Sequence, residues 1–224
     1  MKPIIGALIL VPLMEAIALA QAPTADAKEG RLYIEGGVGF GVTSMWPDAK
    51  SDKGFDSAAL FGANFAGEYG ITEQFAVFSK FGIGLVLEDE PGILNLGMTF
   101  DGAYKVIEKK GDVPALTAYA GLGFVNIDVD PKGGKSDDAT DFVFETGAQM
   151  DFGPENLSIQ PFLGFQLVGG SRPFKTYNGV LQVVAGVKAL IKLTDNLYLS
   201  PSVTFLGGNF QDSVMFGFGV QLRL

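Results

Sequence analysis

Apolar residues alternate with polar or very small ones along nearly the whole chain after its N-terminal region. In the first such stretch Ile34 and Phe40 fall on one face, whereas Glu35 and several glycines fall on the other. The last stretch repeats the arrangement, with Phe216 and Phe218 on the apolar face. Side chains of a β-strand point to opposite faces in turn, so this period of two predicts strands with one apolar face.

A short phrase recurs where several of these strands begin: an acidic residue, an amide, and then alternating apolar residues. It starts at Glu73, Glu155 and Asp195, with weaker counterparts at Glu29 and Asp112. The five starts are separated by 44, 39, 43 and 40 residues, a spacing that fits one β-hairpin per repeat. Five hairpins predict ten strands. They are placed at 31–44, 57–70, 75–87, 93–106, 115–127, 141–152, 157–168, 179–193, 197–207 and 213–224.

The connections between these strands alternate in length. Short turns are predicted at 70–73, 153–156 and 194–196, and longer polar links at 45–56, 128–140 and 169–178. Short turns at one end and long loops at the other are typical of outer-membrane barrels. The predicted fold is therefore all-β: a transmembrane, antiparallel up-and-down β-barrel of about ten strands, with eight as the alternative.

The N-terminus has the order of a secretory signal peptide. Lys2 precedes an apolar run over 4–13, and the small-residue triplet Ala18-Leu19-Ala20 follows, so we expect 1–20 to be a cleaved signal peptide. Residues 21–30 would then be a short periplasmic segment and 31–224 the barrel. After residue 20 the sequence has no apolar run of roughly 20 residues, so a membrane-spanning chain must close its sheet into a barrel.

The composition of the polar face indicates which side meets lipid. This face is rich in Gly, Ala, Ser, Thr and Gln, which suit a narrow lumen better than the water-exposed exterior of a soluble periplasmic barrel. We therefore expect the apolar face to contact lipid. Tyr69, Tyr104 and Phe152 fall on that face near the periplasmic ends of their strands, where they would form an interfacial aromatic girdle.

Charged residues within the strands fall on the small-residue face in equal numbers. Since a charge inside a narrow barrel is costly unless it is paired, this balance predicts an ion-paired, largely plugged lumen. The predicted network consists of Glu35, Glu68, Asp101, Glu145 and Asp151 with Lys80, Lys105, Lys188, Lys192 and Arg223.

The alternating Gly/Phe strands, the phrase Leu193-Thr194-Asp195-Asn196-Leu197-Tyr198-Leu199 and the terminal strand 215–224 together resemble the OmpA-like and small porin-like outer-membrane barrels. The resemblance covers nearly the whole mature chain. It implies the bacterial outer membrane as location, surrounding lipid and lipopolysaccharide, and assembly by the barrel-assembly machinery. Proteins of that group usually end in an aromatic residue, whereas this chain ends in Leu224, which leaves Phe216 and Phe218 to supply the assembly signal.

The absence of His and Cys limits the catalytic and metal-binding sites that the chain can form. The known barrel enzymes of the outer membrane resemble one another in using a catalytic His, so we expect no enzyme, no cofactor and no metal site. The acidic runs 88–90, 128–130 and 137–138 lack the spacing of a calcium loop and are expected to be solvated. A net charge of −9 argues against nucleic-acid binding.

Two functional hypotheses remain. The first is a non-enzymatic structural, envelope-stabilising or surface-interaction role, in which Arg172 and Lys175 of an outer loop contact lipopolysaccharide phosphate or an unidentified protein partner. The alternative is a narrow porin-like channel for small solutes or ions.

Overall fold

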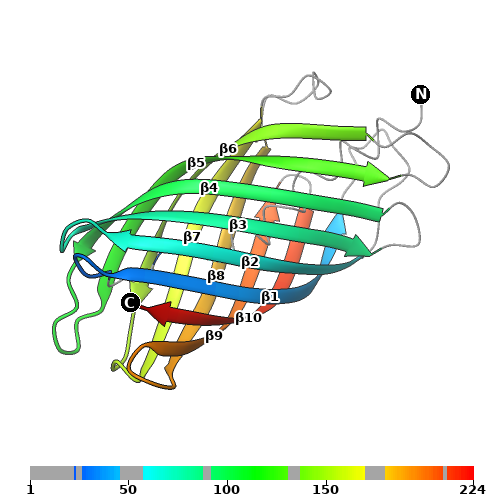
Figure 1. The fold of residues 1–224 in the computed structure, drawn as a ribbon. Helices are drawn as coiled ribbons and strands as arrows, with labels where there is room; N and C mark the ends of the chain where they lie inside the picture. Colours follow the sequence, from blue (N-terminus) through cyan, green and yellow to red (C-terminus); the bar gives the residue numbers. More distant parts are fainter. Residues whose placement is uncertain are drawn as a thin grey trace.

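Ten antiparallel strands close into a single barrel (Figure 1). The computed structural model describes residues 23, 27–45, 58–87, 92–130, 137–169, 180–208 and 211–224. Each strand pairs with its neighbours in the chain, and β1 closes the sheet by pairing with β10. The strands are β1 (Leu32–Met45), β2 (Ala58–Gly70), β3 (Phe75–Leu87), β4 (Gly92–Ile107), β5 (Ala115–Asp130), β6 (Asp137–Asp151), β7 (Leu157–Gly169), β8 (Val180–Lys192), β9 (Leu197–Gly208) and β10 (Gln211–Arg223). The predicted count of ten strands is confirmed.

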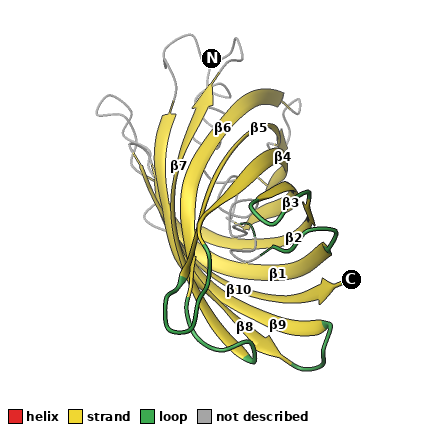
Figure 2. Ribbon diagram, turned by 90° about the vertical axis from the view of Figure 1, so that its left-hand side faces the viewer, coloured by secondary structure: helices red, strands yellow, loops and turns green. Residues whose placement is uncertain are grey.

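The connections between consecutive strands lie alternately at the two ends of the barrel. Odd-numbered strands begin at what we call the turn end, where the connections 71–74, 108–114, 152–156 and 193–196 lie (Figure 2). They finish at the opposite end, which we call the loop end. The predicted signal peptide lies outside the described residues. No helix long and apolar enough to cross a membrane occurs in the described parts of the chain.

The recurrent phrase marks real strand starts. β3, β7 and β9 begin at Phe75, Leu157 and Leu197, each directly after the amide residue of the phrase. Two of the turns also share their hydrogen bonds: the N–H groups of Ile71 and Thr72 donate to the carbonyl of Phe75, and those of residues 193 and 194 donate to the carbonyl of Leu197. The repeat therefore encodes a repeated turn as well as a repeated strand.

The hairpin of β5 and β6 is longer than predicted. The backbone continues in register through Asp128↔Asp138 and Val129↔Asp137, so the connection is 131–136 and the expected link 128–140 was too long. The acidic residues suggested a solvated loop, yet a strand end tolerates them because the backbone ladder does not depend on side-chain type. Among the described residues, no group of three or more acidic side chains is placed to hold a metal ion.

Large apolar side chains cover the outside of all ten strands. Phe142 and Leu122 are 75% and 67% exposed, and Phe40 and Phe216 stack across the closing β1/β10 pair with ring centroids 5.7 Å apart. A water-soluble barrel would place such side chains inside, so this exterior is suited to lipid. Tyr69, Tyr104 and Phe152 also lie on the exterior, near the turn end.

Candidate functional site: the charged half of the lumen

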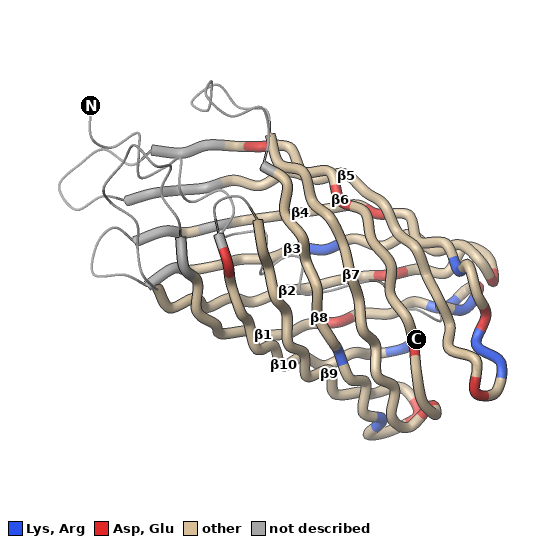
Figure 3. The backbone as a smooth tube through the Cα atoms, turned by 180° about the vertical axis from the view of Figure 1, so that it is seen from behind, with Lys and Arg blue, Asp and Glu red and all other residues tan. Residues whose placement is uncertain are grey.

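The inward-facing side chains change in character along the barrel axis. In the half near the turn end they are long, charged or aromatic, and in the half near the loop end most are small or neutral. Figure 3 shows the charged residues of the strands gathered largely toward the turn end. The buried charged side chains of the turn half are Glu35, Glu68, Lys80, Asp101, Lys105, Glu145, Asp151 and Lys188.

The most deeply buried ion pair joins Lys80 of β3 to Glu145 of β6. Two further strands, β4 and β5, lie between their strands in the sheet, so the contact crosses part of the lumen. The side chains are 1% and 2% exposed. The Lys80 ammonium also lies 5.9 Å from the centre of the Tyr119 ring, and nearby Asp101 accepts a hydrogen bond of 3.1 Å from the Thr99 hydroxyl. Because water is excluded there, each charge of this pair is stabilised by its partner and not by solvent.

A second pair crosses another part of the lumen. Lys188 of β8 lies 3.1 Å from Glu35 of β1, and β9 and β10 separate the two strands in the sheet. The Gln221 amide donates to the same carboxylate oxygen of Glu35 at 3.3 Å. Four of the ten residues predicted for the network thus form two pairs, each of which joins strands that are not neighbours in the wall.

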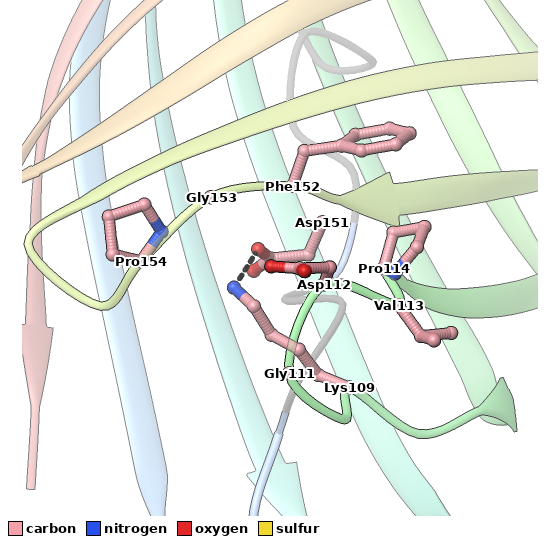
Figure 4. A pocket seen from close by; sticks show the side chains of 9 residues that line it. All are labelled: Lys109, Gly111, Asp112, Val113, Pro114, Asp151, Phe152, Gly153 and Pro154. Atoms are coloured by element: carbon pink, nitrogen blue, oxygen red, sulfur yellow. Dashed lines mark hydrogen bonds and ion pairs between the residues drawn. The ribbon is translucent and has the colours of Figure 1, made fainter.

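A chain of amides leads from the lumen wall to the turn end. Gln149 donates to Gln160 at 2.8 Å, and Gln160 donates to Asp151 at 2.9 Å. Asp151 also pairs with Lys109 at 2.6 Å, at a pocket of about 290 Å³ between the connections 108–114 and 152–156 (Figure 4). Sequence reasoning missed Lys109, because the residue follows β4 and the predicted network was restricted to strand residues.

The remaining predicted network residues have other surroundings. Glu68 is an inward, buried side chain of β2, and Lys105 donates to the backbone carbonyl of Ala27 at 3.2 Å. The Arg223 guanidinium lies 3.9 Å from the centre of the Tyr198 ring, and its Nε donates a hydrogen bond of 3.1 Å to the side-chain carbonyl of Gln221. Arg172 and Lys175 lie outside the described residues.

Lys192 lies at the rim and not in the lumen, because β8 ends at this residue. It pairs with Glu155 at 2.9 Å and with Asp195 at 3.2 Å, both in exposed turns. The hydrogen bond from Lys192, followed by its charge, lowers the pKa of the Glu155 carboxyl. The rim therefore carries an ion pair of the same chemistry as the lumen pairs, but in contact with water.

The expected equality of acids and bases does not hold among the buried side chains. Within the described residues these comprise six acids, the five predicted ones and Asp141, but three lysines, Lys80, Lys105 and Lys188. Lys192 and Arg223 are less buried because they end their strands, and the alternation places Asp141 inside near the start of β6. The buried lining is therefore acidic.

Comparison with known proteins places this architecture in a family. The family model described as "outer membrane protein beta-barrel domain" matches residues 12–160. No curated protein matches the sequence closely enough to count as a relative.

Several solved structures share the fold. The chain is similar to the translocator domain of the autotransporter NalP from Neisseria meningitidis, with a TM-score of 0.53, 10% identity, and coverage of 94% of this chain and 93% of that chain. It is also similar to the transport unit of the autotransporter AIDA-I from Escherichia coli, with a TM-score of 0.51, 11% identity and 99% coverage of both chains. At such identities the likeness concerns the fold alone.

Proposed function

We propose that this chain, which belongs to the outer membrane protein β-barrel domain family, is a non-enzymatic envelope or surface-interaction protein whose lumen is occluded by its own side chains. Its location is the bacterial outer membrane, where the apolar exterior faces lipid. In barrels of this kind the short turns face the periplasm and the longer loops face outward. The turn end is accordingly the periplasmic end of the lumen.

The Lys80–Glu145 pair is the observation that carries the occluded lumen. A lysine and a glutamate from separated strands meet in the barrel interior, and neither side chain retains appreciable contact with solvent. Buried Tyr198, Gln149 and Gln160 occupy further space in the same half of the barrel. A lumen crossed by such contacts supports a scaffold better than an open conduit.

The absence of His from the sequence and the engagement of the inward carboxylates support a non-catalytic role. Glu145, Glu35 and Asp151 each form an ion pair, which leaves them poorly suited to exchange protons with a substrate. Contact with lipopolysaccharide, assembly by the barrel-assembly machinery and a protein partner at the loop end are parts of the same proposal.

Planar-bilayer recordings test the occlusion. The refolded protein is expected to give no steady conductance, whereas the double variant Lys80→Ala/Glu145→Ala should give reproducible open events because it removes both long side chains that meet in the lumen. Thr204→Ala, a truncation of a buried side chain in β9 nearer the loop end, is the matched control and should stay closed. Steady conductance of the unaltered protein would refute the occluded lumen.

The second candidate is a narrow channel that prefers cations, and the excess of buried acids over buried lysines favours it. Carboxylates lining a pore raise the local concentration of cations. The same recordings decide between the two candidates: a channel requires steady, cation-selective current from the unaltered protein, with selectivity reduced by Glu145→Gln.

A further inference from the structure

The chain turns sharply just before β1. The backbone N–H of Arg31 donates to the carbonyl of Lys28 at 3.1 Å, and Gly30 between them has a φ of 71°, in the left-handed region that suits glycine. We call Ala27–Arg31 the N-terminal strap. Ala27, which directly precedes this turn, is buried, and so is Pro23.

Backbone hydrogen bonds attach the strap to the turn end of β2. Gly30 donates to the carbonyl of Gly70 at 2.9 Å, and Gly70 donates to the carbonyl of Arg31 at 3.1 Å. The backbone N–H of Lys28 donates to the hydroxyl of Tyr33, an inward residue of β1, at 3.0 Å. The strap is thus held by the two strands that border it.

Lys105 holds the strap from inside the lumen. Its ammonium donates to the carbonyl of Ala27 at 3.2 Å, and both residues are buried. The pairing of β4 with β5 shifts register between Lys105 and Ile107. Such a bulge changes the direction of nearby side chains, and bulges are often found next to functional sites.

Gly70 is required for the strap to sit where it does. A Cβ atom at this position would overlap the carbonyl oxygen of Lys28 and come within 2.6 Å of its carbonyl carbon. These are backbone atoms, which cannot move aside without moving the strap. At Gly67, on the same strand, a Cβ atom would have no neighbour within 4 Å.

We infer that the N-terminal strap places Ala27 as a plug in the periplasmic mouth of the lumen, docked there by Gly70 and by the Lys105 ammonium on the backbone of Ala27. The mouth thus receives peptide backbone through the Lys105 ammonium, and its occupant is this chain. This closure is separate from the cross-lumen pairs, because Lys105 and Gly70 contribute to neither of them. The inference rests on the proposed function in that both assume a closed lumen.

Cysteine accessibility tests the plug, and the chain contains no native Cys to interfere. In the folded barrel, Ala27→Cys should react with a bulky water-soluble maleimide at least roughly tenfold more slowly than Glu29→Cys, because Glu29 is exposed and Ala27 is buried. Equal rates at the two positions would overturn the plug.

Two pairs of variants in the Ala27→Cys background identify what docks the strap. Gly70→Ala should accelerate labelling by roughly tenfold or more, whereas Gly67→Ala should leave it unchanged. Lys105→Met should accelerate labelling by roughly tenfold, since it removes a hydrogen bond from a charged donor, whereas Lys109→Met should not.

Labelling that is unaffected by both Gly70→Ala and Lys105→Met, in barrels that migrate as folded protein, would refute the docking. If Gly70→Ala fails to fold, the Lys105→Met comparison decides the matter. The result is distinct from that of the bilayer recordings: a non-conducting protein with a readily labelled position 27 would refute the strap and leave the occluded lumen standing.

Discussion

The two halves of the lumen are lined by the same ten strands but by different kinds of side chain. In the turn half, lysines and carboxylates meet across the interior, as in Lys80–Glu145 and Lys188–Glu35. In the loop half, β1 presents Gly39 and Gly41, and other strands present residues such as Thr204 and Val184. Because the backbone is continuous, the difference lies in the side chains alone. The alternation of apolar and polar residues determines which face lines the lumen. The size and charge of the inward residues determine how the lumen is filled.

The two halves also gain stability in different ways. A buried charge in the turn half is stable while its partner is present, because removal of one partner leaves a desolvated ion. In the loop half a glycine instead permits close approach of neighbouring strands. A Cβ atom at Gly41 would overlap the carbonyl oxygen of Val214 and lie 3.0 Å from the Cα of Met215. Specific charged partners therefore matter in the turn half, and lack of bulk matters at positions such as Gly41 in the loop half.

The largest effect is expected from removing one charge of a lumen pair. Lys80→Met leaves Glu145 buried without its cation and should lower the free energy of unfolding by about 3–5 kcal/mol. Urea unfolding of the barrel in micelles or bilayers, followed by tryptophan fluorescence or gel migration, measures this loss.

The double variant Lys80→Met/Glu145→Met is the control for that loss. It removes both charges of the pair and fills similar space, so much of the lost stability should return, although buried Asp101, which also interacts with Lys80, stays in place. A double variant as unstable as the sum of its single variants would mean that the pair contributes no coupling, and the proposed importance of partners in the turn half would be wrong.

A smaller effect is expected from adding bulk to the loop half. Gly41→Ala forces β1 and β10 apart at the closing seam and should cost about 1–3 kcal/mol. Gly36→Ala on the same strand is the matched control, because the nearest atoms to its Cβ lie 4.0 Å away. The same urea titration compares them. Equal stability of the two variants would show that the small residues of the loop half are not required for strand approach.

Much of the fold was predictable because alternation is a local signal. The phrase at Glu73, Glu155 and Asp195 located three strand starts to the residue, and the apolar face was correctly assigned to the exterior. The β5/β6 hairpin was underestimated because acidic residues are poor markers of a strand end. Local pattern thus sufficed for strand number and orientation.

The partners inside the lumen were not predictable in the same way. Pairing of Lys80 with Glu145 depends on how the curved sheet turns the inner faces of β3 and β6 toward each other, which a single strand does not encode. Lys109 enters from a turn, and the strap engages Lys105 through a backbone carbonyl, which has no sequence signature. Contacts across a closed barrel follow from its three-dimensional curvature.

The smallest expected effect comes from the exposed rim pair Glu155–Lys192. Comparison with the lumen pair tests whether stability comes from burial or from pairing itself. Glu155 and Lys192 form the same kind of pair as Glu145 and Lys80, yet Glu155 is 73% exposed. Because the hydrogen bond from Lys192 lowers the pKa of Glu155 in the folded state, the pair stabilises the barrel above the unfolded pKa. That stabilisation is lost as the pH falls through the lowered folded value. Lys192→Met should raise the Glu155 pKa toward its usual range in a carboxyl NMR titration.

Water and salt reach the rim pair, so its effect on unfolding should be slight and should decrease further in about 1 M salt, where the Debye length is roughly 3 Å. The lumen pair should keep its effect under the same conditions, since its side chains are out of contact with solvent. If salt weakened Lys80–Glu145 as much as Glu155–Lys192, the lumen would have to be wet. The lumen pair and the rim pair would then differ only in their position along the barrel and not in their exposure to water.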